Sequence, residues 1–168
     1  YLFTNLRDDV CGYFMAQTSD ELCRRIGVSR DEADTFAAIS HQRTERSISE
    51  GVWEQEIVQV ETPGGLVGFS DEDHVVIGTT EESLSGLRTH FGPESLVTAG
   101  NASGVVDGAA ALIVKSASRA AADGDSPLSR ILSWGIVGLE PSIMAHGPVP
   151  SSRLALEKAG LKVDDIDL

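Results

Sequence analysis

The sequence predicts a layered α/β fold. Patterns typical of helices and loops fill the first half of the chain, and strand and helix patterns alternate after Leu96. Such alternation is typical of helices packed on a sheet. An unbroken apolar run over residues 109–114 predicts a strand buried on both faces, as in a layered fold. With 168 residues, 41% of them hydrophobic, the chain is long enough to form a core.

Two capping boxes predict the first two helices. Thr18 with Glu21 predicts a short helix over residues 22–26, which Gly27 ends. The second box predicts a longer helix that closes before Gly51. This box is formed by Ser29 and Glu32, and the expected shared face of its helix by Ala33, Phe36, Ala37 and Ser40.

A hairpin is expected after the second helix. Residues 52–61 alternate in part as a strand, and Pro-Gly-Gly at 63–65 predicts a turn into a second strand over residues 66–69. Thr79 or Thr80, with Glu82, then predicts a short helix that ends near His90.

Strands and helices alternate in the rest of the chain. The expected elements are strands on both sides of a turn that follows Leu96, an alanine-rich helix over 116–122, a strand over 129–139, and a helix over 150–159 that starts at Pro150 or Ser151 and stops at Gly160.

The turn over residues 97–104, Val-Thr-Ala-Gly-Asn-Ala-Ser-Gly, carries mostly small side chains. Gly100 and Gly104 can adopt backbone angles closed to other residues and leave room for close approach. Asn101 tolerates left-handed geometry, and Ser103 offers a donor and an acceptor. This composition suits a turn beneath a bound molecule. A plain turn between core strands would use the same residue types, so the turn alone leaves both interpretations open.

The charge of the chain excludes some partners. Acidic residues outnumber basic ones by 26 to 13, which gives a net charge of −13. Nucleic acids and anionic membranes need clustered Lys and Arg, so neither is expected as a partner. The same field opposes the phosphates of a nucleotide, which would require local positive charge. No apolar run approaches the roughly 20 residues of a membrane span.

Cysteine usage predicts a reducing, cytoplasmic setting. Cys11 and Cys23 lack metal-ligand spacing and form no disulfide framework. Neighbouring carboxylates oppose a thiolate at Cys11, which is therefore interpreted as a structural residue. The acidic stretch 71–74 offers oxygen ligands, but a solvated loop is favoured, and no metal site is expected.

Several segments, in order, resemble motifs of the thiolases, the acyl-CoA acetyltransferase family. The turn with the Asp-Gly-Ala at 107–109 is similar to the family's Thr-Ala-Gly-Asn-Ser/Ala-Ser-Gly pattern and the Asp-Gly-Ala that follows it. The other matching segments are residues 29–43, 79–84, 127–133, 141–150, 156–160 and 164–168. The resemblance therefore covers nearly the whole chain.

The resemblance implies part of the layered αβαβα thiolase fold with its inserted loop domain. Residues 1–92 would be the loop domain, 93–126 the end of the N-terminal half, and 127–168 the start of the C-terminal half. Thiolases also carry a nucleophilic Cys before this region and Asn-Glu-Ala-Phe, Gly-His-Pro and second-Cys segments after it; none of these is in the sequence. An internal fragment without catalytic residues is therefore expected. Another interpretation, that the 168 residues act alone, is disfavoured because half a layered fold would leave residues 109–114 uncovered.

The resemblance also implies contacts with coenzyme A. In thiolases the Ala and Ser of the turn touch the pantetheine arm, and these positions correspond to Ala99 and Ser103. Met144 matches the family methionine at the thioester end of the ligand, where a polarizable side chain suits varied acyl groups. Plain core packing is the alternative role for Met144.

Further positions match the family less closely. Ser83 and Phe91 align with loop-domain positions near the nucleotide, and Leu6 with an apolar contact before it; a structural role is the alternative for each. Phe14 stands where short-chain biosynthetic thiolases have a His, which favours degradative or less typical substrates. Val76 stands where some members have an Arg, which removes a cation expected near the phosphates.

The implied function is acyl transfer to or from coenzyme A, by 3-ketoacyl-CoA thiolysis or acetyl-CoA condensation through an acyl-cysteine intermediate, as in fatty acid metabolism. This part would form the coenzyme A and pantetheine tunnel. Coenzyme A thioester is the expected substrate, without a further cofactor, in a homodimer or homotetramer. Phe14 and Val76 keep a second interpretation open: a non-catalytic thiolase-like module that binds acyl-CoA or assembles a complex.

Overall fold

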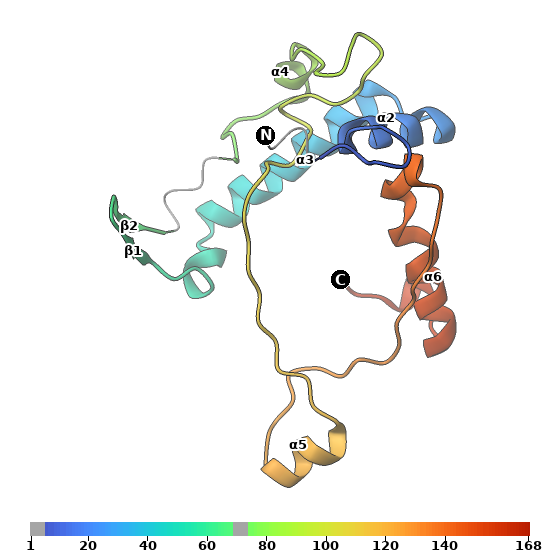
Figure 1. Cartoon of the computed structure of the whole chain (residues 1–168). Helices are drawn as coiled ribbons and strands as arrows, with labels where there is room; N and C mark the ends of the chain where they lie inside the picture. Colours follow the sequence, from blue (N-terminus) through green and yellow to red (C-terminus); the bar gives the residue numbers. More distant parts are fainter. Residues whose placement is uncertain (1–5, 69–73) are drawn as a thin grey trace. The chain divides into compact units, whose positions relative to one another are not determined.

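The computed structural model describes residues 6–68 and 74–168 and divides the chain into two compact units, Tyr1–Gly104 and Val105–Leu168 (Figure 1). The first unit contains the helices α2 (Met15–Ile26), α3 (Arg30–Ser49) and α4 (Glu81–Ser85), the 3-10 helix η1 (Val52–Gln55), and the strands β1 (Val60–Thr62) and β2 (Gly65–Val67). The second contains α5 (Ala117–Asp123), η3 (Pro141–His146), α6 (Pro148–Ala159) and η4 (Val163–Asp165).

Helix α2 begins at Met15, seven residues before the start of the predicted helix at residue 22. Its N-cap residue is Phe14, whose N–H donates to Gln17 Oε1 at 2.9 Å. Thr18, the expected cap, lies inside the helix, where its buried hydroxyl donates to Met15 O at 2.6 Å. Gly27 ends the helix with a φ of 78°, as predicted.

Helix α3 begins and ends as predicted. Ser29 Oγ accepts from Glu32 N at 3.2 Å, and Glu32 Oε2 accepts from Ser29 N at 2.8 Å, which completes the capping box. The Glu32 carboxylate also accepts from Ser29 Oγ at 2.9 Å, and the two bonds that it accepts, from Ser29 N and Ser29 Oγ, hold the pKa of Glu32 below its usual value. The helix ends at Ser49, before Gly51.

The buried face of α3 differs from the expected one. Asp34, Ala37 and Ala38 are buried, whereas Phe36 is 75% exposed. Ala33 is half-buried and Ser40 exposed, so the expected apolar face is wrong. Ala37 and Ala38 pack with Leu84, so α4 covers a narrow strip of small side chains on α3 and leaves the ring of Phe36 exposed.

The predicted hairpin is confirmed. Strands β1 and β2 pair antiparallel, with Thr62 opposite Gly65 across the Pro-Gly turn. The expected first strand is too long, because Val52–Gln55 forms the 3-10 helix η1. Phe69, at the end of the expected second strand, lies outside the described residues.

Helix α4 is capped as predicted by one of the two threonines but is shorter than expected. Thr80 Oγ1 accepts from Ser83 N at 3.2 Å, so Ser83 and not Glu82 completes the cap. The helix ends at Ser85, well before His90.

In the second unit α5 and α6 agree with the predicted bounds within two residues, whereas the 3-10 helices η3 and η4 were not predicted. Ser116 caps α5 by accepting from Arg119 N at 3.2 Å. Helix α6 begins at Pro148, earlier than Pro150, and ends at Gly160 with a φ of 70°. Segment 133–135 packs on α6, where Ser133 Oγ donates to Ala155 O at 2.6 Å.

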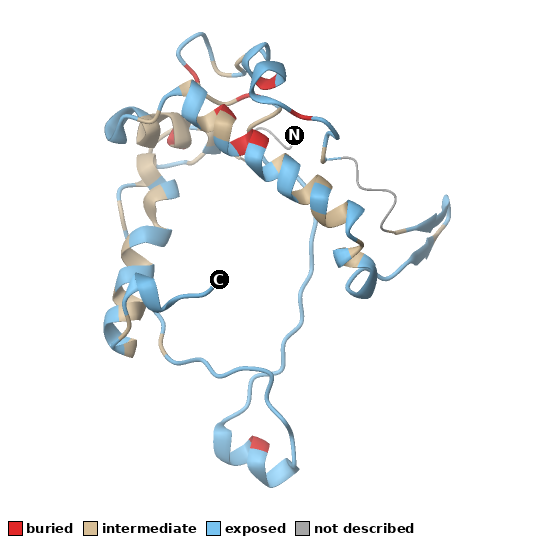
Figure 2. Cartoon of the chain, turned by 180° about the vertical axis from the view of Figure 1, so that it is seen from behind, coloured by how far each residue is buried: buried red, intermediate tan, exposed pale blue. Residues whose placement is uncertain are grey.

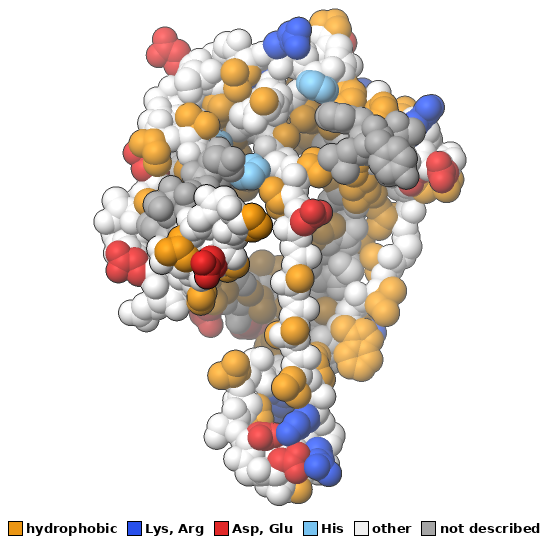
Figure 3. All heavy atoms as spheres, turned by 60° about the vertical axis from the view of Figure 1, so that its left-hand side comes forward, with side chains coloured by type: hydrophobic (Ala, Val, Ile, Leu, Met, Phe, Trp, Pro, Cys, Tyr) orange, Lys and Arg blue, Asp and Glu red, His pale blue; other side chains and the backbone are white. Residues whose placement is uncertain are grey.

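The charged side chains of α5 and of the residues that flank it are paired with one another. Lys115 Nζ lies 3.0 Å from Asp123 Oδ2 and also contacts Asp125, and Arg119 Nε lies 2.8 Å from Asp123 Oδ2. Figure 3 shows these basic and acidic groups side by side at this end of the unit. The bonds from Asp125 and Asp123 raise the pKa of Lys115. This surface therefore offers little unpaired positive charge to a phosphate.

The strands predicted after Leu96 are not formed within the described part of the chain. Residues 103–116 and 129–140 adopt neither helix nor strand, and before the turn only an isolated bridge joins Thr98 to Thr89. Leu112 and Ile113, expected to be buried, are each 89% exposed (Figure 2). A strand needs a hydrogen-bonded neighbour, and among the described residues no segment pairs with this apolar run in a sheet.

Candidate functional site

Hydrogen bonds to helix α3 hold the turn over residues 97–104 in place. The centre of the attachment is Asn101: its Nδ2 donates to Asp34 Oδ1 at 2.9 Å and to Leu96 O at 2.8 Å. Its Oδ1 accepts from Thr98 N at 2.8 Å. Three bonds thus join the amide to both the preceding segment and the buried carboxylate, so the turn has a defined shape.

Asp34 is itself held in place. It is 2% exposed, and its Oδ2 accepts from Arg30 Nε at 2.7 Å. Arg30 Nη2 donates in addition to Leu84 O at 2.8 Å and to Leu87 O at 3.2 Å. A buried carboxylate is tolerable when it is paired and fully hydrogen-bonded, as here.

A second attachment comes from further along α3. His41 Nε2 lies 3.3 Å from Gly100 O. Because a carbonyl oxygen only accepts, this contact is a hydrogen bond when Nε2 carries the proton. Helix α3 therefore holds the turn at two points along its length.

The glycines of the turn are needed for space and not for unusual backbone angles. Neither Gly100 nor Gly104 has a positive φ, and Asn101 does not adopt left-handed geometry, so these expectations are wrong. A Cβ at Gly100 would overlap Leu84 Cδ2 and lie 2.5 Å from Leu87 Cδ1. A Cβ at Gly104 would overlap the ring of His74. The glycines thus make room for side chains of the chain itself, and the close approach of a bound molecule stays a prediction.

The two predicted ligand contacts of the turn lie on its open side. Ala99 and Ser103 are both exposed, while Thr98 is 1% exposed. The turn therefore buries Thr98, half-buries Asn101 and presents a methyl group and a hydroxyl outward. Such a surface can accommodate a slender chain with amide groups.

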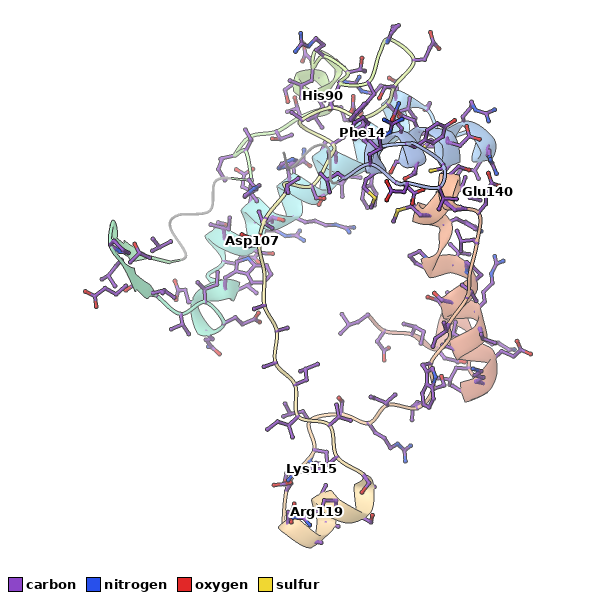
Figure 4. All side chains as sticks on the ribbon, in the orientation of Figure 1. Phe14, His90, Asp107, Lys115, Arg119 and Glu140 are labelled. Carbon is purple, nitrogen blue, oxygen red and sulfur yellow. The ribbon has the colours of Figure 1, made fainter. Side chains whose placement is uncertain are left out.

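Two of the predicted contact residues lie against each other. The ring centroids of Phe14 and Phe91 are 5.6 Å apart, and those of His90 and Phe91 are 5.3 Å apart. Figure 4 shows Phe14 beside the segment that carries His90. Both phenylalanines are half-buried, so each still presents part of a ring to its surroundings.

A hollow of about 420 Å³ lies between α2 and the segment that carries Phe91. Its walls include Asp20, Glu21 and Glu94 against a single cation, Arg24, which is bonded to Glu21 at 2.8 Å. Excess negative charge makes this hollow unsuitable for a phosphate.

The other two predicted contacts of this unit have structural bonds. Ser83 Oγ donates to Thr80 O at 2.8 Å, within the cap of α4, although the residue is exposed. Leu6 is half-buried and its carbonyl accepts from Met15 N at 3.3 Å. Val76 is 63% exposed, so an apolar side chain occupies this surface position.

Met144 belongs to the second unit. It lies on η3 with 42% of its surface exposed, so it is not a fully packed core residue within the described chain. Its accessible thioether remains available for contact with an apolar group.

The structure gives no sign of a disulfide at either cysteine. Both thiols are unpaired and half-buried. Burial, followed by the charge of Asp20, raises the pKa of Cys23. Among the described residues there is no group of His, Cys, Asp or Glu placed to hold a metal ion. Asp71 and its two neighbours in the acidic stretch lie outside the described residues.

No helix in the described ranges, 6–68 and 74–168, has the length and apolar character that crossing a membrane requires.

Comparison with known proteins identifies the class. The family description "Thiolase, N-terminal domain" matches residues 2–118, and "Thiolase, C-terminal domain" matches residues 125–168. The chain belongs to the thiolase family.

Among curated relatives, the chain is 41% identical over 165 residues to the acetyl-CoA acetyltransferase of Shinella zoogloeoides, covering 97% of this chain and 42% of that protein. It is 46% identical over 158 residues to the 3-ketoacyl-CoA thiolase of Citrobacter koseri, covering 92% and 41% respectively. The chain thus spans about two fifths of the length of these relatives, 42% in the first.

Solved structures agree on the fold. Human mitochondrial 3-ketoacyl-CoA thiolase in complex with CoA matches with a TM-score of 0.90 and 37% identity, covering 99% of this chain and 42% of that one. The Bacillus anthracis acetyl-CoA acetyltransferase matches with a TM-score of 0.87 and 33% identity, covering 99% and 43%. The predicted α/β thiolase fold is confirmed.

Proposed function

We propose that this chain forms part of the coenzyme A tunnel of an acyl-CoA acyltransferase that makes or cleaves 3-ketoacyl-CoA. The support is the shape of the turn: Thr98 and Asp34 are buried and Asn101 is half-buried, while Ala99 and Ser103 are exposed. The likeness to a thiolase structure in complex with CoA, at a TM-score of 0.90, also supports it.

In this proposal the turn contacts the pantetheine arm. Ser103 bonds an amide of the arm, and Ala99 leaves room for the chain beside it. Met144 contacts the acyl end of the ligand, where its exposed thioether adapts to groups of different shape.

The remaining contacts lie toward the nucleotide. The Phe14–Phe91 pair, with Leu6, supplies apolar surface, and Ser83 a hydroxyl. Because the hollow beside Phe91 is acidic, the phosphates would lie against another side of this ring.

The chain would contribute walls and not catalytic groups. The attacking thiolate, which takes the acyl group from a 3-ketoacyl-CoA and passes it to the sulfur of a second coenzyme A, lies outside residues 1–168 in this proposal. Residues 1–92 act as the loop domain, 93–126 complete the N-terminal half, and 127–168 open the C-terminal half. The family descriptions change between residues 118 and 125, which supports the second boundary.

We further propose a cytoplasmic homodimer or homotetramer. Both cysteines are unpaired, as a reducing compartment favours. Light scattering on the complete gene product would give its mass, and a monomer at micromolar concentration would contradict the assembly.

The decisive test is acyl transfer by the complete gene product. Acetoacetyl-CoA and coenzyme A should be converted to two molecules of acetyl-CoA, followed by loss of the enolate absorbance, with a longer 3-ketoacyl-CoA as a second substrate. Loss of the Ser103 hydrogen bond in Ser103→Ala should raise KM about fivefold. Ser85→Ala, which changes an exposed serine of α4, is the matched control. A folded protein with no turnover on either substrate contradicts the enzymatic proposal.

A second candidate is a non-catalytic module that binds acyl-CoA or assembles a complex. The exposed Val76, which provides no cation near the proposed nucleotide, favours it. Calorimetry separates the two: coenzyme A binding without turnover supports the module, whereas turnover excludes it.

A further inference from the structure

The unusual feature of the turn is a buried ionic connection behind it. Asp34 uses one carboxylate oxygen for Arg30, at 2.7 Å, and the other for Asn101, at 2.9 Å. We call these three residues the Arg30–Asp34–Asn101 bridge. A buried carboxylate is costly, and apolar packing of the kind that Ala37 and Ala38 make with Leu84 would hold two segments together without one.

The hydrogen bonds of the bridge fix the orientation of the side chains that they join, which apolar packing does not do. The Asn101 amide has its donors and its acceptor committed to three partners, so the side chain has one orientation. Thr98 N–H and Leu96 O, which bond to this amide, lie before Ala99, and Ser103 follows within two residues of Asn101. The position of the exposed side of the turn is thus fixed by a side chain on its buried side.

The other end of the bridge is equally constrained. Arg30 Nε donates to Asp34. Arg30 Nη2 donates to two carbonyl oxygens of the α4 region, Leu84 O and Leu87 O. Leu84 and Leu87 also fill the space against Gly100. The same few residues therefore determine both the orientation of the turn and its distance from α4.

We propose that Asp34 is a positioning residue for ligand binding: through Asn101 it holds Ala99 and Ser103 where a coenzyme A thioester can contact them. The inference rests on the proposed function, but it concerns residues that do not touch the ligand. It explains why a charge, and not a methyl group, occupies the buried face of α3 opposite the turn.

The experiment compares variants of the complete gene product by calorimetry with coenzyme A and by steady-state kinetics with acetoacetyl-CoA. In Asp34→Asn the new amide has one acceptor oxygen and one NH2 group. It therefore cannot accept from both Arg30 and Asn101, and one of these donors faces the NH2 group. Coenzyme A should bind about tenfold more weakly. KM should rise by a similar factor, while kcat should change by less than about twofold, because the reacting groups are elsewhere.

The matched control is Ser29→Ala. It removes the cap of the same helix, and so lowers the thermal midpoint, without touching the bridge. Its affinity for coenzyme A should stay within about twofold of the parent. Loss of stability and loss of affinity are thereby separated.

Asn101→Ser provides a second variant if Asp34→Asn does not fold, since Asp34 keeps its bond to Arg30. The same loss of affinity, about tenfold, is expected. Folded variants that bind coenzyme A as tightly as the parent overturn the inference alone. A folded parent that binds no coenzyme A overturns the proposed function and the inference with it.

Discussion

Replacement of Gly100 by alanine tests the packing of the turn against α4. The new methyl group would lie 2.5 Å from Leu87 Cδ1 and would overlap Leu84 Cδ2. Ordinary carbon contacts are about 3.5–4.0 Å, so both leucines must move by about 1 Å or more. Leu84 is 3% exposed and packs on Ala37 and Ala38, so it cannot move without opening this cluster. Overpacking of this kind should lower the free energy of unfolding by about 1–3 kcal/mol.

The assay is denaturant unfolding of the complete gene product. Gly86→Ala is the matched control, because its Cβ would have as nearest neighbour Ser83 O at 3.9 Å, an ordinary contact. That variant should be neutral or more stable by up to about 1 kcal/mol. In Gly100→Ala/Leu87→Ala the removed side chain should recover part of the loss. If Gly100→Ala and Gly86→Ala unfold at the same denaturant concentration, the proposed close packing is wrong.

Two further substitutions test local geometry. In Gly135→Ala the Cβ would overlap Ser151 O, a backbone atom that cannot rotate away, so a loss of about 3 kcal/mol is expected in unfolding experiments; Gly138→Ala, with no atom within 4 Å, should show none. Hydrogen bonds from Ser29 hold the pKa of Glu32 below 4.5, so the ionised carboxylate stabilises the fold above this pH. The difference in free energy of unfolding between the parent and Glu32→Gln should shrink as the pH falls toward about 3. A difference that grows with acidification would contradict this assignment.

Local signals in the sequence predicted helix ends well. Ser29 caps α3 and Gly160 ends α6 as expected, because both roles depend on groups within a few residues. Thr18 misled the prediction: its spacing to Glu21 imitates a capping box, but its hydroxyl bonds back to Met15 O inside the helix. The actual signal was Gln17, three residues after Phe14, whose side chain caps the first turn.

Strands were harder to predict for a physical reason. The apolar run at 109–114 indicates that a segment needs cover on both faces, but it does not indicate which segment supplies the hydrogen bonds. The Pro-Gly hairpin was predicted because both of its strands are adjacent in sequence.

Some residues of the candidate site were likewise predicted from the sequence, and others were not. The small, exposed residues of the turn were recognised from composition and family resemblance. Arg30 and Asp34 were missed as its support, although their spacing of four residues on a helix predicts an ion pair. The hydrogen bond that Asn101 donates to Asp34 joins residues 67 positions apart, and no periodic pattern in the sequence indicates such a contact.

The aliphatic stretch that ends at Val114 has a consequence for laboratory work. Residues 108–114 carry no charge, so the large negative charge of the chain lies elsewhere and does not protect them from self-association. Two copies laid edge to edge would satisfy both their peptide groups and their side chains. Expression of residues 1–168 by themselves should therefore yield sparingly soluble, sheet-rich aggregates. The substitution Leu112→Lys should keep the expressed chain in solution.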